Sequence, residues 1–71
     1  MTYAVIVERA SAGCSAYAPD LPGCAATGQT MEEVRDEIRE AIEFQIEGLR
    51  EAGLPVPEPT STAVQVDVRA A

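Results

Sequence analysis

The side chains that could act as nucleophiles are three serines and two cysteines: Ser11, Ser15, Ser61, Cys14 and Cys24. A serine or cysteine nucleophile needs an adjacent base, and the chain contains no histidine that could serve as one. The spacing of the two cysteines fits none of the short zinc-binding patterns such as C-x2-C. We therefore predict that the chain is not an enzyme and that it holds no metal and no cofactor.

Carboxylates offer a second kind of chemistry, because the chain has 12 acidic and 5 basic residues and a net charge of −7. Glu8, Asp20 and Asp67 could gather at strand ends and bind Mg2+, as in a metal-dependent hydrolase. Acids so scattered also occur by chance in an acidic chain. Metal-dependent hydrolysis is therefore kept as a rival hypothesis.

Most of the negative charge falls in one predicted helix, which carries eight acidic residues and three arginines. This charge repels phosphate backbones, so we expect no direct binding to nucleic acid. The acidic row is either a solvated face or a docking surface that steers a basic protein partner. The candidate contacts on the helix are Glu40, Glu43 and Glu47.

The first 28 residues predict a three-stranded meander. The first strand is apolar on both of its faces, which is typical of a central strand. Turn-forming residues, including Gly13 and the Pro19 to Gly23 run, separate it from two shorter strands. The predicted strands are residues 3–8, 14–18 and 24–27.

This hairpin register separates the two cysteines. It places Cys14 at the Gly28 end of the third strand, roughly 13 Å from Cys24 at ~3.3 Å per residue. A disulfide needs Cα atoms within ~7 Å of each other. We therefore expect both cysteines to be small buried hydrophobic residues.

One long helix is predicted from Met31 onward. Thr30 and Glu33 match the capping box that begins many helices. Gly53 and Pro55 mark its end, which gives a helix of about 22 residues. Its predicted buried stripe consists of Val34, Ile38, Ala41, Ile42, Leu49 and Ala52.

Three side chains of this helix leave alternatives open. Phe44 and Ile46 lie on the flanks of the stripe, so they either border the core or help to bury a subunit interface. Gln45 lies near the middle of the stripe. Either the helix overhangs the sheet there, or the amide is hydrogen-bonded across an interface.

A fourth strand is predicted at residues 62–68, where valines alternate with other residues after a proline-rich strap at 54–59. A right-handed crossover would bring it beside the first strand. The predicted fold is therefore α+β, a single βββαβ domain over residues 1–71 with sheet order 3-2-1-4 and one long helix on one face.

A chain of 71 residues buries a small core. Because disulfide and metal are not expected and the first strand is apolar on both faces, we predict a homo-oligomer, a dimer or tetramer. The short apolar run near the N-terminus is neither a leader nor a membrane span, so we predict a cytoplasmic chain with no membrane contact.

Several motifs together resemble the N-terminal domain of HicB-type antitoxins. They are the run Asp20, Leu21, Pro22, Gly23 and Cys24, then the capping box at Thr30, then Ala41-Ile42-Glu43 and the strap. The resemblance spans nearly the whole chain. It implies a partial RNase-H-like fold, assembly into oligomers, and binding of a small basic HicA-type toxin, an mRNA-cleaving ribonuclease whose active site is covered.

The resemblance has one departure, because such antitoxins usually carry a C-terminal DNA-binding segment and this sequence stops at Ala71. DNA binding is therefore not carried over, and a stand-alone oligomerising domain without a toxin remains the alternative function. From the family motif, residues 20–24 are carried over as candidate partner contacts. They either touch a partner or shape a turn.

Overall fold

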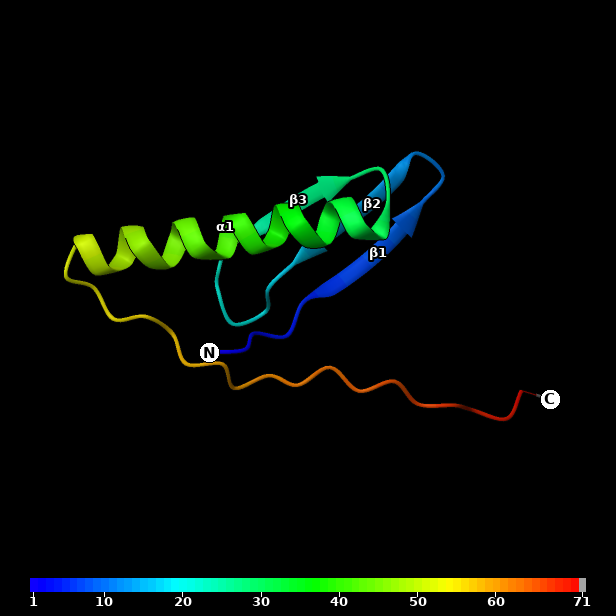
Figure 1. Cartoon of the computed structure of the whole chain (residues 1–71). Coiled ribbons are helices and arrows are strands. Elements are labelled where there is room, and N and C mark those ends of the chain that lie inside the picture. The colour runs from blue at the N-terminus through cyan, green and yellow to red at the C-terminus, as the bar shows by residue number, and fades with distance from the viewer. Residues whose placement is uncertain (71) are drawn as a thin grey trace.

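The computed structural model describes residues 1–70 as a three-stranded antiparallel sheet followed by one long helix (Figure 1). The sheet order is β1-β2-β3. The α+β class, the meander and the long helix predicted from the sequence are confirmed. The elements are β1 Ile6–Ala10, β2 Gly13–Tyr17, β3 Ala25–Gly28 and α1 Met31–Glu51.

The register of the meander follows the hairpin predicted from the turn residues. Gly13 adopts a φ of +140° where the chain reverses between β1 and β2. Cys14 lies opposite Gly28, as the predicted register requires, and both cysteines are free. Val7, Ala16 and Ala26 lie across from one another, so they share the face that α1 covers.

The core lies between this face of the sheet and α1. Tyr3, Val5 and Val7 are half-buried and pack against it, so these alternate residues share one side of the chain. The buried core residues are Ala16, Ala18, Leu21, Cys24, Val34 and Ile38.

Both ends of α1 form as the sequence predicts. The Thr30 hydroxyl accepts a hydrogen bond from the backbone N–H of Glu33 at 3.1 Å. At the other end Gly53 has a φ of +70° and donates to the carbonyl of Arg50, while the N–H of Leu54 donates to Leu49. This pair of bonds is a Schellman motif, which satisfies carbonyls that the helix would leave unpaired.

The helix is longer than the sheet that it covers. Its 21 residues span about 31 Å at ~1.5 Å per residue, whereas a five-residue strand spans about 16 Å. The C-terminal half of α1 therefore extends beyond the strands (Figure 1). Gln45 lies in this half, and its amide Nε2 donates to the carbonyl of Pro22 at 3.2 Å. The overhang alternative is confirmed, with the amide bonded within the chain.

The predicted fourth strand is wrong for the described structure. No residue from 54 to 70 belongs to a strand, so the sheet order 3-2-1-4 reduces to 1-2-3. The segment instead runs extended past β1 and diverges from it toward the C-terminus (Figure 1). The first part of this segment is held by hydrogen bonds of Pro57 to Tyr3 and of Thr60 and Ser61 to Asp20, and beyond these bonds it does not pair with β1.

Candidate functional site

The exposed face of α1 gathers the three predicted helix contacts. Glu40, Glu43 and Glu47 are all exposed and fall within about 60° of helical arc at 100° per residue. Phe44 lies about 40° beyond Glu40 at the edge of this arc and is 80% exposed. We call these four residues the Phe44 face.

Phe44 protrudes because its neighbours on the helix surface are small or charged. Ala41 precedes it by three residues and Gly48 follows it by four, so neither covers the ring. Glu40 and Glu47 occupy the other two neighbouring positions. An aromatic ring inside a polar rim is the arrangement that anchors many protein–protein interfaces. The sequence placed Phe44 off the core stripe but left its role open.

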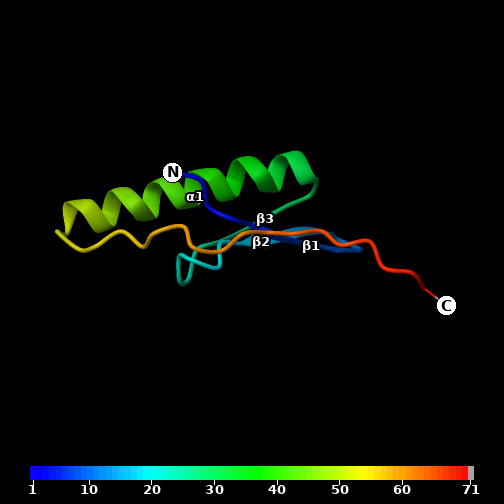
Figure 2. The ribbon, with the colours of Figure 1, turned by 90° about the horizontal axis from the view of Figure 1, so that it is seen from below.

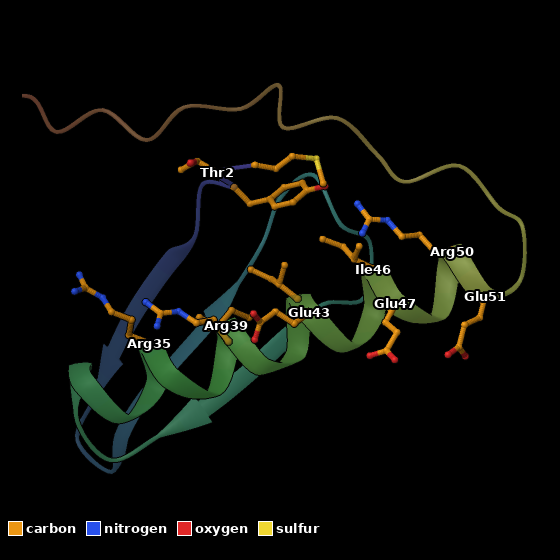
Figure 3. Close-up of a pocket in the computed structure, with 12 residues that line it drawn as sticks. Thr2, Arg35, Arg39, Glu43, Ile46, Glu47, Arg50 and Glu51 are labelled. Atoms are coloured by element: carbon orange, nitrogen blue, oxygen red, sulfur yellow. The ribbon is translucent and has the colours of Figure 1, made fainter.

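A groove of about 1000 Å³ lies on the other flank of α1, between the helix and the first residues of the chain (Figure 3). Ile46 is half-buried, points toward these residues and lines the groove. Glu47 and Glu51 point away from them. The basic residues that line the groove are Arg35, Arg39 and Arg50. Glu43, Glu47 and Glu51 also line the groove, so two members of the Phe44 face lie at its border.

The carboxylate of Asp20 ties the C-terminal segment to the turn between β2 and β3. Its Oδ2 accepts the backbone N–H groups of Thr60 at 3.0 Å and Ser61 at 2.8 Å. Its Oδ1 accepts the hydroxyls of Thr60 at 3.2 Å and Ser61 at 2.8 Å. These bonds, led by the one from the Ser61 backbone, lower the pKa of Asp20 from its ordinary value of 3.8. We call this arrangement the Asp20 latch.

The other motif residues mainly shape the turn. Leu21 is 1% exposed and Cys24 is 4% exposed, and burial raises the pKa of the Cys24 thiol. Gly23 has a φ of +78°, which favours glycine. Pro22 is exposed and its carbonyl accepts the bond from Gln45. Of the five motif residues, Pro22 and Gly23 are thus the most accessible to a partner, and Pro22 contacts α1 through Gln45.

Three contacts of the C-terminal segment were not predicted from the sequence: those of Thr60 and Ser61 with Asp20, and that of Pro57 with Tyr3. Thr60 and Ser61 follow the proline-rich strap, and the signal that was available is a pair of hydroxyl residues with free N–H groups. Tyr3 packs against the core, and its hydroxyl donates to the carbonyl of Pro57 at 2.6 Å. All three contacts join residues far apart in sequence, which spacing does not reveal.

Comparison with known proteins identifies the family. A family model described as the HicB_like antitoxin of bacterial toxin-antitoxin systems matches residues 3–69. The chain belongs to the HicB-like antitoxin family. The resemblance inferred from the motifs is confirmed.

Two relatives and one solved structure extend this comparison of the HicB-like chain. A UPF0150 protein of Synechocystis sp. is 42% identical over 57 residues, which is 79% of this chain and 72% of the relative. A 14.9 kDa protein from the rep-hol intergenic region of Haemophilus phage HP1 is 36% identical over 58 residues. That match covers 82% of this chain but spans 44% of the phage protein's length. A chain of the HicA3 and HicB3 toxin-antitoxin complex superposes with a TM-score of 0.71 at 30% identity, covering 84% of this chain and 70% of that one.

The residues described in this HicB-like chain bring together no group of three histidine, cysteine or acidic side chains that could hold a metal ion. Glu8, Asp20 and Asp67 of the rival hypothesis are thus not assembled within residues 1–70. Over the same residues, the structure has no helix with both the length and the apolar character needed to cross a bilayer.

The Asp20 latch should open in acid. Because the pKa of Asp20 is lowered on folding, its stabilising effect is complete above pH 3.8 and is lost as the pH falls through the folded-state value. Hydrogen exchange followed by NMR should find the amides of Thr60 and Ser61 protected near neutral pH. In Asp20→Ala they should exchange at the rate of an unstructured peptide.

Asp67→Ala is the matched control for this prediction. Asp67 is an exposed aspartate of the same C-terminal segment and lies outside the latch. It should leave the protection of both amides unchanged. Equal protection in wild type and Asp20→Ala at neutral pH would rule out the latch.

Proposed function

We propose that this chain is a noncatalytic antitoxin that binds a small basic HicA-type ribonuclease and covers its active site. Membership of the HicB-like family supports this proposal, as does the 0.71 TM-score to a chain of a HicA3 and HicB3 toxin-antitoxin complex. The observation that carries it is the Phe44 face, where an aromatic ring that is 80% exposed has carboxylates along one side.

The charge of the helix favours a basic partner. Eight acidic and three basic residues give α1 a net charge of −5, within a chain of net charge −7. Such a field accelerates encounter with a cationic protein, while the fixed ring of Phe44 provides the contact that slows dissociation. Pro22 and Gly23 extend the proposed surface, and the buried Leu21 and Cys24 support it from below.

The absence of histidine from the sequence supports the noncatalytic part of the proposal. The thiol of Cys24 is buried and its pKa is raised, which disfavours the thiolate that nucleophilic attack requires. Inhibition by this chain would therefore be stoichiometric. One molecule would block one toxin without turning over.

The test uses the short basic protein encoded next to the gene for this chain. Its RNA cleavage should stop at one equivalent of the chain. Neutralising the Phe44 face with Glu40→Gln, Glu43→Gln and Glu47→Gln should slow association by about tenfold at low salt, within the range that electrostatic steering supplies. Stopped-flow measurement of the association rate over a series of salt concentrations checks this.

The matched control neutralises three acids away from that face, with Glu8→Gln, Glu58→Gln and Asp67→Asn. Its net charge equals that of the test variant, so an effect of total charge alone would slow both equally. Equal slowing would exclude the Phe44 face as the contact. No complex at low salt, and no such neighbouring gene, would favour the alternative of a stand-alone oligomerising domain.

A further inference from the structure

The C-terminal residues 62–69, which we call the valine segment, have the pattern of a strand but pair with no strand of the described chain. Val64, Val66 and Val68 are 74, 73 and 80% exposed. Within the described chain, no backbone group from residue 62 onward takes part in a hydrogen bond to another backbone group. Alternate valines on one side and unpaired backbone groups favour pairing with a strand edge.

β1 has such an edge. It pairs with β2 on one side and with no strand of the described chain on the other. Every second residue of an edge strand presents its N–H and C=O groups outward, where another strand can bind them. Each of the two strands carries one acidic and one basic residue, so their charges are compatible. These residues are Glu8 and Arg9 on β1, and Asp67 and Arg69 on the valine segment.

The shape of the chain indicates that the valine segment is not packed within its own molecule. The Cα radius of gyration is 14.1 Å, whereas a compact chain of this length has about 11 Å. The principal extents are 52 × 26 × 16 Å. Figure 1 shows the segment running past β1, and Figure 2 shows it at the level of the sheet.

Two contacts fix the chain just before the segment. The Tyr3 hydroxyl binds the carbonyl of Pro57, and the Asp20 latch holds Thr60 and Ser61. The stiff proline run between 54 and 59 leads into this anchored stretch. From these fixed points the valine segment passes β1 of its own chain without pairing. The outer edge of β1 and the backbone groups of the valine segment therefore stay unpaired.

We propose that two copies of this chain form a dimer by exchanging their valine segments, each of which adds to the free edge of β1 in the other copy. The segment of a second copy is not fixed relative to this β1 by the latch, so it can approach to pairing distance. A two-fold axis forms the same pairing twice, which joins the two sheets into one. This inference does not depend on the binding of a toxin.

Sedimentation equilibrium of the full chain at micromolar concentration tests the dimer. Wild type should have twice the 7.5 kDa mass of the chain. Val66→Lys places a charge in the middle of the apolar side and should shift the mass to that of the monomer. Because the segment lies outside the core, circular dichroism should show that this variant keeps its helix and sheet. A monomeric wild type, or a dimeric Val66→Lys, would overturn the proposal.

Gln65→Lys is the matched control, because it adds the same charge one residue away on the opposite side of the segment. It should remain a dimer, and its dissociation would overturn the one-sided pairing. Isotope-filtered NOEs in a mixture of labelled and unlabelled chains then identify the partner strand. Contacts between residues 62–69 and β1 should occur between chains. Contacts exclusively within one chain would overturn the exchange and restore a fourth strand in its own sheet.

Discussion

Leu21→Ala should leave a large fraction of the chain unfolded in water. Leu21 is 1% exposed and is among the largest fully buried side chains. Truncating such a leucine costs about 2–5 kcal/mol because it removes apolar contacts and leaves a cavity. A core of this size supplies only about 3–5 kcal/mol of stability. Urea unfolding followed by circular dichroism should therefore show a midpoint shifted far toward zero denaturant.

Leu54→Ala makes the same chemical change at a side chain that is 55% exposed, just beyond the end of α1. Surface substitutions usually change stability by about 0.5 kcal/mol or less. The loss in free energy of unfolding should therefore be several-fold larger for Leu21→Ala than for Leu54→Ala. A loss of under about 1 kcal/mol for Leu21→Ala would mean that the turn is not part of the core, since that is below the range for buried leucines.

This result bears on the meaning of the family motif. In residues 20–24 the leucine and cysteine fill the core, the glycine allows the turn, and the aspartate holds the C-terminal segment. These contacts show that the motif shapes the turn, and contact of Pro22 and Gly23 with a partner stays a prediction. Loss of toxin binding in a motif variant would need a check of folding before it identified a contact residue.

Local signals in the sequence predicted the elements well. Thr30 and Gly53 mark the two ends of α1 because capping depends on residues within one turn of the helix. The hairpin register follows in the same way from Gly13 and the turn before β3. Each of these features is decided by neighbours in sequence, so spacing was sufficient to predict it.

The C-terminal segment could not be predicted in the same way. Alternating valines indicate a strand, but whether a strand pairs depends on which edge is open and which face the helix covers. Here the outer edge of β1 is open, but Asp20 binds residues 40 and 41 positions away, just before the valines. The candidate site shows the same difference between local and distant features. Helical spacing alone placed Phe44 off the core stripe. The contact of Gln45 with Pro22 joins residues far apart in sequence and was not predicted.

Gly28→Ala should destabilise the fold by about 1–3 kcal/mol, the usual cost of inserting an extra methyl group into a packed core. A Cβ atom on Gly28 would lie 2.7 Å from the backbone nitrogen of Val34 and 3.0 Å from its Cα. These are backbone atoms of α1, so no side chain can move aside and the helix itself must shift. Val34 is 0% exposed, and a shift would loosen the core around it.

Gly48→Ala makes the same substitution within α1, where a Cβ atom would meet nothing within 4 Å. A helix-interior glycine costs about 0.5–1 kcal/mol relative to alanine, so this variant should be more stable than wild type. One glycine-to-alanine change should therefore lower the free energy of unfolding and the other should raise it, as measured by urea unfolding. The two glycines differ chiefly in the space around them, because the backbone of α1 lies close to Gly28 and nothing lies close to Gly48. Equal effects of the two substitutions on the free energy of unfolding would therefore mean that α1 does not rest on β3 at Gly28.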